Sequence, residues 1–233
     1  MRNYALAVLL SAVGFIPAAW SEAQPAAAPA PNPAWKVPQV IEFMGIKQGD
    51  HVADVIAGRL TTAIAQAVGP TGTVYAVETA EVVKSHPEAL TRMKGAAEQF
   101  PNISVSAEPV SAPLPSGLDV VFIRQNYHDL YDKFMGPADV AAFNKAVFTA
   151  LKPGGVYVVL DHAAAKGSGL AATETLHRID PERVKADVLA AGFKLDAQSD
   201  LLANPADDRS KQVFDPSIRD HTDQFLFRFR KPK

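Results

Sequence analysis

Polar side chains that could hold a ligand or move a proton stand at or near the ends of four short apolar runs. They are Asp54, Glu78, the tetrad Asn126–Asp129 and the pair Asp161–His162. In a parallel α/β sheet, ligands bind beyond the carboxyl ends of the strands, where the strand order reverses. We therefore expect these four groups to converge on one cleft, although they are far apart in the sequence.

Glu78 has the placement of a ribose ligand. A carboxylate at the end of a second strand can accept hydrogen bonds from both ribose hydroxyls, and dinucleotide sites place this acid about 20 residues past their glycines. Glu78 follows Gly58 by 20 positions. The alternative is an acid that only faces solvent. Asp54 could contact the ligand, or it could orient the neighbouring loop by accepting backbone N–H groups, as short acids readily do.

The tetrad offers candidates for a base. His128 follows an apolar run, and histidine can take up a proton near neutral pH. The alternative is a histidine that hydrogen-bonds Asp129 or the loop backbone. Tyr127 is a second candidate base, and Asn126 could contact a cofactor or substrate, although asparagine also favours turns. We predict catalytic roles for His128, Tyr127 and Asn126.

Two further histidines, His162 and His177, raise the question of a metal site with His128 and Asp161. Their spacing matches no local metal motif, and the absence of cysteine excludes thiolate sites and disulfides. We predict no metal ion. His177 and Arg178 are expected in a lid or substrate loop, with the alternative that Arg178 anchors that loop to the acids.

The polar groups depend on a βαβ unit at residues 49–78. Apolar residues recur with helical spacing between its two strands, and the Gly and Pro of Gly69–Gly72 end the helix. Strands and helices alternate along the rest of the chain, which predicts a parallel sheet with helices on both faces. The predicted strands are 51–56, 73–77, 103–105, 118–123, 156–160, one from 193, and 225–229; the predicted helices are 37–46, 60–68, 79–100 with a new start at Pro87, 138–151 and 181–191.

The last strand differs from the others. Phe225, Phe227 and Phe229 alternate with other residues, and this period of two with one apolar face fits an edge or antiparallel strand. The predicted fold is therefore α/β, with a doubly wound, mostly parallel seven-stranded sheet and an antiparallel final strand.

Composition limits the classes of function. The 233 residues, 48% of them hydrophobic, suffice for one sizeable domain. A formal charge of −2 argues against a nucleic-acid-binding protein, which would need a basic surface. The expected partner is a small-molecule substrate.

The N-terminus has the layout of a secretory signal peptide. A basic start is followed by the apolar run Ala5–Trp20 and small residues at Ser21 and Ala23. The alternative, an uncleaved anchor, would need about 20 apolar residues. We predict a signal peptide at 1–23, an Ala/Pro-rich linker at 24–34, a folded domain at 35–233, and a periplasmic or secreted protein with no stable membrane span after cleavage.

Four segments resemble the motifs of class I S-adenosylmethionine-dependent methyltransferases. Asp54–Leu60 is similar to the nucleotide-loop motif, Val74–Glu78 to the second motif, Leu118–Ile123 to the fourth-strand motif, and Leu151–Gly155 to the turn before the fifth strand. The resemblance covers the chain from about Val37 to its end.

A narrower resemblance is to an exported group of predicted methyltransferases of unknown substrate. It combines the signal segment, the tetrad, Asp161–His162, Leu176–Asp180 and the ending Phe225–Pro232. These resemblances imply S-adenosylmethionine as cofactor and methyl transfer to an unidentified small acceptor. The implied cofactor-binding residues are Asp54, Ala57, Gly58, Glu78 and Asn126.

The loop departs from the family pattern. Only Gly58 of the three motif glycines is present, and Ile56 and Leu60 occupy the other two places. This favours a second hypothesis, a catalytically inactive binding or regulatory module of the same fold in the periplasm. A third is a hydrolase or metal-dependent enzyme that uses His128, His162 and Asp161.

Overall fold

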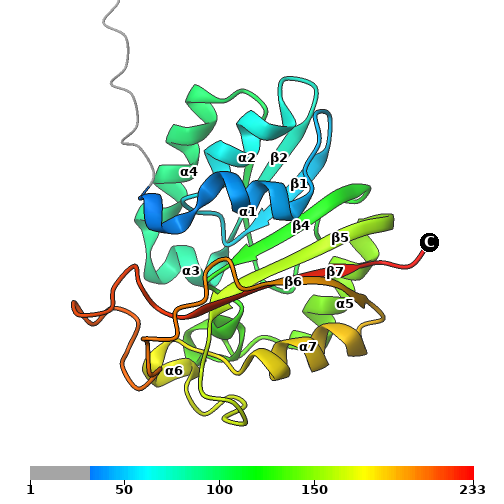
Figure 1. Ribbon diagram of the computed structural model, residues 1–233. Coiled ribbons are helices and arrows are strands. Elements are labelled where there is room, and N and C mark those ends of the chain that lie inside the picture. The colour runs from blue at the N-terminus through cyan, green and yellow to red at the C-terminus, as the bar shows by residue number, and fades with distance from the viewer. Residues whose placement is uncertain (1–31) are drawn as a thin grey trace, which may run out of the picture. The chain divides into compact units, whose positions relative to one another are not determined.

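A seven-stranded sheet forms the centre of the structure, a computed structural model that describes residues 32–233 (Figure 1). Its strand order is β3-β2-β1-β4-β5-β7-β6, and β7 alone runs antiparallel to its neighbours. The strands are β1 (His51–Val55), β2 (Thr73–Thr79), β3 (Ile103–Glu108), β4 (Leu118–Arg124), β5 (Leu151–His162), β6 (Lys194–Ser199) and β7 (Gln224–Arg230).

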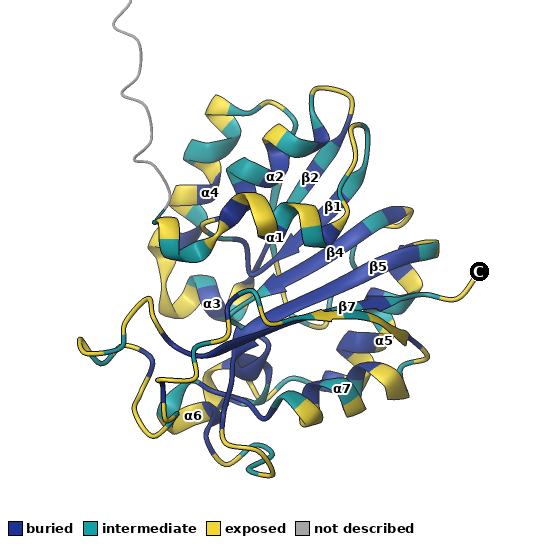
Figure 2. Ribbon diagram, in the orientation of Figure 1, coloured by how far each residue is buried: buried dark blue, intermediate teal, exposed yellow. Residues whose placement is uncertain are grey.

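Helices cover both faces of this sheet. Apolar side chains of α1, α2 and α4 belong to one core cluster, and those of α5 and α7 belong to the other. Figure 1 shows these two groups on opposite sides of the strands, and Figure 2 shows β4 and β5 buried along most of their length. The helices are α1 (Val37–Met44), α2 (Thr61–Val68), α3 (Ala80–Ser85), α4 (Pro87–Gln99), α5 (Val140–Ala150), α6 (Thr173–Leu176) and α7 (Pro181–Ala190), with 3-10 turns η1 (Pro33–Trp35), η2 (His128–Tyr131) and η3 (Lys133–Met135).

The strand order reverses beside β1. The chain adds β2 and β3 on one side of β1 and then returns to add β4 on the other. Val55 lies opposite Val77 on β2 and opposite Ile123 on β4. The residues that follow these three strand positions therefore emerge at one level, at the carboxyl edge of the sheet.

Capping side chains fix where the helices around this edge begin. The Thr79 hydroxyl accepts a hydrogen bond from the Val82 N–H at 3.2 Å and starts α3. Pro87 occupies the first turn of α4, as the sequence predicts. Asp180 accepts from the Glu182 N–H at 3.0 Å and starts α7.

The predicted architecture is confirmed, with two local differences. β5 begins at Leu151 instead of Val156 because Leu151 pairs with Leu118, so the predicted turn at 152–155 lies within the strand. β7 is antiparallel as predicted, but it lies between β5 and β6, and β6 forms the edge of the sheet.

The N-terminal predictions concern a different part of the chain. The predicted signal peptide (1–23) and most of the predicted linker (24–34) lie outside the described residues. Among residues 32–233, none of the helices has the length and apolar character needed to cross a membrane.

We predict that Gly72→Ala destabilises the fold. A Cβ at Gly72 would lie 2.5 Å from the Val68 Cβ and 2.7 Å from the Asp50 carbonyl oxygen. Because the backbone must move to relieve this overlap, the free energy of unfolding should fall by about 1–3 kcal/mol. The measurement is urea denaturation.

Gly95→Ala provides the matched control. Gly95 lies inside α4, and a Cβ there meets nothing within 4 Å. The control should gain about 1 kcal/mol from helix propensity. Equal stabilities of the two variants would contradict the packing at Gly72.

Candidate functional site

A cavity of about 800 Å³ opens beyond the carboxyl ends of β1, β2 and β4. Asp54, Glu78 and Arg124, one from each of these strands, line it. The cavity also reaches Asn126, His128 and His177. The structure thus brings most of the sequence-predicted site residues to one place.

Glu78 has a buried carboxylate that makes no hydrogen bond within the described part of the chain. Its side chain is fully buried, and neither carboxylate oxygen has a hydrogen-bond partner among the described residues. Burial and the nearby charge of Asp54 raise the pKa of Glu78 to about 7, against an opposing effect of Arg92. A buried acceptor without partners is costly, and its position in the cavity makes it available to a ligand.

Asp54 has a structural contact of its own. The Thr61 hydroxyl donates to the Asp54 carboxylate at 2.6 Å and accepts from the Gly58 N–H at 3.1 Å. Burial raises the pKa of Asp54 to about 6, although the Thr61 hydrogen bond lowers it. Asp54 therefore contacts the loop after β1 through the Thr61 hydroxyl, whereas the predicted structural role named backbone N–H groups, and its side chain also lines the cavity.

Three non-glycine residues on the cavity wall have left-handed backbones. Ile56, Gln125 and His177 have φ values of 53°, 56° and 52°. A β-branched side chain rarely adopts this conformation, so the backbone at Ile56 is strained. Ile56 therefore has the left-handed backbone for which the similar motif uses glycine. Ala57, Gly58 and Leu60 line the cavity beside it.

His128 is held between two carboxylates. Its Nδ1 lies 2.8 Å from Asp161 Oδ1, and its Nε2 lies 3.1 Å from Asp129 Oδ1. Burial alone would lower the pKa of His128, but the charges of Asp161 and Asp129 raise it well above its ordinary value. Both ring nitrogens of His128 are therefore occupied by carboxylates, which does not suit the predicted role as a base.

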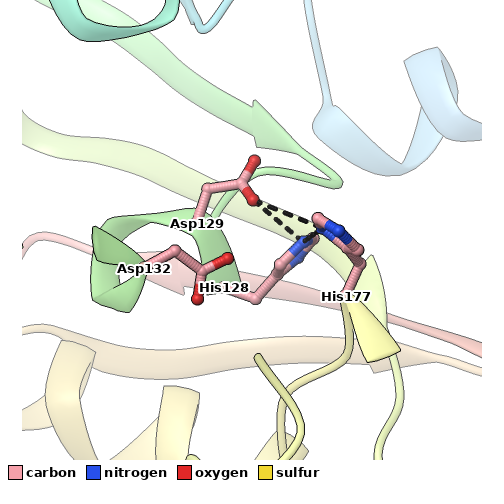
Figure 3. A group of neighbouring side chains, drawn as sticks. All are labelled: His128, Asp129, Asp132 and His177. Atoms are coloured by element: carbon pink, nitrogen blue, oxygen red, sulfur yellow. Dashed lines mark hydrogen bonds and ion pairs between the residues drawn. The ribbon is translucent and has the colours of Figure 1, made fainter. Parts of the chain in front are cut away.

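Asp129 joins the tetrad to the loop that carries His177. The Asn126 side-chain amide donates to Asp129 Oδ2 at 2.7 Å. His177 Nδ1 lies 3.8 Å from Asp129 Oδ1, and Figure 3 shows these two side chains beside His128. Burial would raise the pKa of Asp129, but the hydrogen bond and charge of His128 hold it well below its usual range.

Tyr127 lies elsewhere. Its side chain is fully buried in the core, its hydroxyl accepts a hydrogen bond from Asn144 at 2.7 Å, and it does not line the cavity. Burial raises the pKa of Tyr127 well above its usual value. The prediction of Tyr127 as a base does not fit this position, since the hydroxyl faces α5 instead of a ligand.

A buried arginine holds the loop after β5 in place. Arg178 is fully buried, pairs with Asp207 at 2.8 Å and donates to the Ala163 carbonyl at 3.1 Å. This is the predicted alternative in which arginine anchors the loop to an acid. His162 Nδ1 lies 2.7 Å from the Thr222 hydroxyl, and burial lowers its pKa well below the ordinary value.

Several residues of the site were not predicted. Arg92 and Arg124 supply positive charge near Glu78 and Asp54, and Asp132 lies beside His128 after the 3-10 turn η2. The sequence offered one usable signal, the acid Asp129 inside the tetrad. Nothing in the spacing marked Asp132, because it becomes a neighbour of His177 only through the packing of α6 against η2.

Comparison with known proteins identifies the fold. The chain matches no protein-family model and no curated protein sequence. Among solved structures it is similar to an S-adenosylmethionine-dependent methyltransferase from Aquifex aeolicus, with a TM-score of 0.56 and 17% identity over 83% of this chain and 88% of that one. The chain thus has the Rossmann-like fold of S-adenosylmethionine-dependent methyltransferases, as its motifs predicted.

Two further neighbours bear on what the fold can host. A possible exported protein from Bordetella parapertussis has a TM-score of 0.51 and 15% identity over 85% of this chain and 68% of that one. The cyclase SpnF has a TM-score of 0.58 and 15% identity over 85% of this chain and 81% of that one. One fold therefore carries more than one chemistry, and the reaction has to be argued from the site.

The buried charge of Glu78 predicts a pH-dependent gain of stability in Glu78→Gln. The pKa of Glu78 is raised from 4.5 to about 7, so its folding contribution is fully present below pH 4.5 and is lost as pH rises through about 7. At pH 8 the variant should therefore unfold about 2–8 °C higher than the unsubstituted protein. The difference should shrink at pH 5, where both side chains are neutral in the folded state.

Thermal unfolding at the two pH values is the measurement. Glu98→Gln, on the exposed side of α4, is the matched control and should change stability by less than about 0.5 kcal/mol. A Glu78→Gln variant less stable than the parent at pH 8 would show that the carboxylate has a partner in the folded protein.

Proposed function

We propose that the cavity binds S-adenosylmethionine and that the protein transfers its methyl group to a small acceptor. One observation carries the proposal: buried Glu78, whose two carboxylate oxygens have no hydrogen-bond partner among the described residues, lines a cavity at the end of β2. A ribose supplies two adjacent hydroxyl donors, which is the complement of such a carboxylate. The fold of the structural neighbours supports the same reading.

The residues present fit this cofactor. Glu78 would accept the ribose hydroxyls, and Asp54, Ala57 and Gly58 would hold the loop against the methionine part. A volume of about 800 Å³ lies within the range of small-molecule sites and leaves room for an acceptor beside the nucleoside. Arg59, beside this loop, offers a cation for the cofactor carboxylate.

When bound, the cofactor supplies an electrophilic methyl group on a sulfonium. The chain's own residues then need mainly to position the acceptor in line with that group and to exclude water. Asn126, His128 and His177 line the cavity and would hold the acceptor through hydrogen bonds. We assign His128 a positioning role, because two carboxylates hold its ring in place.

A catalytically inactive binding module is the second candidate. The observation that favours it is Ile56, whose buried side chain occupies the loop place where the family has glycine. In that case the cavity would hold another small ligand, or the loop would exclude the methionine part of the cofactor.

Calorimetric titration with S-adenosylmethionine and its demethylated product tests the proposal. Saturable binding is expected, and Glu78→Gln should weaken it by about 10- to 100-fold, since a charge-assisted hydrogen bond is lost at nearly constant volume. Glu98→Gln is the control and should bind like the parent. No binding at millimolar ligand would overturn the proposal.

Ile56→Gly separates the two candidates. If the parent fails to bind and Ile56→Gly binds, the loop excludes the cofactor and the inactive module is the correct reading. If both bind, a coupled assay for the demethylated product with candidate acceptors tests transfer directly.

We further propose that the protein is exported to the periplasm or secreted. The layout of residues 1–23 supports this, and so does the similarity to a possible exported protein from Bordetella parapertussis. N-terminal sequencing of the protein recovered from a Gram-negative expression host should give a start after Ala23. Recovery of the intact Met1 terminus from the cytoplasm would contradict export.

A further inference from the structure

Four side chains, three of them on the cavity wall, meet near one point. His128, Asp129, Asp132 and His177 each offer one ligand atom, and these atoms all lie within 4.8 Å of one another (Figure 3). The first two belong to η2, Asp132 precedes η3, and His177 follows α6. Two short turns and one loop therefore deliver two imidazoles and two carboxylates to one point.

The spacing of three of these atoms is that of ligands around one ion. His128 Nε2 lies 3.1 Å from Asp129 Oδ1 and 3.4 Å from His177 Nδ1, and the latter two atoms are 3.8 Å apart. Nitrogen and oxygen ligands at about 2.0–2.2 Å from a tetrahedral ion lie roughly 3.3–3.6 Å from one another. The triangle is thus close to one face of such a coordination shell.

The neighbours of the cluster orient its ligand atoms inward. Asp161 Oδ1 lies 2.8 Å from His128 Nδ1, and with the proton on Nδ1 the Nε2 lone pair is left for the cluster. Such a carboxylate–histidine pair is the usual support of a metal-bound imidazole. The Asn126 amide likewise occupies Asp129 Oδ2 at 2.7 Å, which leaves Oδ1 toward His128 and His177.

Asp132 supplies an independent observation. Its side chain is buried, and its Oδ1 has no hydrogen-bond partner among the described residues. A buried carboxylate oxygen without a donor needs a cation or a water. Two carboxylates with two neutral imidazoles also carry a charge of about −2, which a divalent cation neutralises.

We propose that His128, Asp129, Asp132 and His177 bind one divalent transition-metal ion of the zinc type. Imidazole with carboxylate suits such ions better than magnesium or calcium, which take oxygen ligands. His128, Asp129 and His177 line the cavity and Asp132 does not, so the ion would lie at the wall of the cavity.

This site differs from the metal hypothesis considered from the sequence. Asp129 and Asp132 replace Asp161 and His162 as ligands, and Asp161 acts as a positioning residue behind His128. The proposal does not depend on S-adenosylmethionine, because none of the four side chains is assigned to the cofactor. It replaces the direct hydrogen bonds of His128 and His177 to the acceptor that are proposed above.

Zinc titration of the chelator-treated full chain tests the site. Calorimetry and elemental analysis should give about one zinc per chain, and cobalt should give visible absorption bands typical of a four-coordinate ion. His177→Asn should weaken zinc binding strongly, and asparagine tolerates the left-handed backbone of residue 177. Asp161→Asn should weaken it by about 10- to 100-fold, as expected for a residue that supports a ligand.

The matched control is His221→Asn, a substitution at an exposed histidine outside the cluster. It should bind zinc like the parent, and circular dichroism should show all variants folded. Equal zinc affinity of His177→Asn and His221→Asn would mean that the binding is adventitious. Absence of zinc binding by the parent would mean that a His128–Asp129 ion pair fills the site. Either result overturns the proposal. Titration of the same samples with S-adenosylmethionine keeps this outcome separate from the fate of the proposed methyl transfer.

Discussion

The pairing of β1 with both β2 and β4 is the constraint on which the site depends. Val55 faces Val77 on one side and Ile123 on the other, so the three strands end at the same level. After β2 the chain leads to β3 on one side of β1, and after β4 it leads to β5 on the other side. The loops that follow these strands therefore diverge. This divergence opens a cavity whose wall includes side chains of both cores, such as Ile56 and Leu60.

The cavity is lined by groups that oppose folding. Glu78 and Asp54 carry raised pKa values, about 7 and about 6, because burial disfavours their charged forms. Ile56 holds a backbone that glycine would adopt freely. The stability of the fold therefore comes from the apolar strands and helices. The strand ends carry buried carboxylates and a strained backbone, and a bound ligand can offset their cost.

The sequence predicted the elements much better than the contacts between them. The apolar runs and the helix start at Pro87 depend on local patterns, and they located most strands and helices to within a few residues. The roles of Tyr127 and Asp132 depend on how η2 packs against α5 and α6, and no local pattern records that packing. Likewise, the interior place of β7 follows from tertiary pairing with β5 and β6, which alternation of phenylalanines cannot specify.

The position of β7 also fixes an order of assembly. Among the described strands, β6 pairs only with β7, yet Gln224–Arg230 is the last of them to be synthesised. Until β7 has been made, β6 has no partner and β5 has one unpaired edge, although β3, β2, β1, β4 and β5 can already pair. The β5–β7 and β6–β7 pairs can therefore form only after every other described strand has been made, so this side of the sheet is the last to assemble.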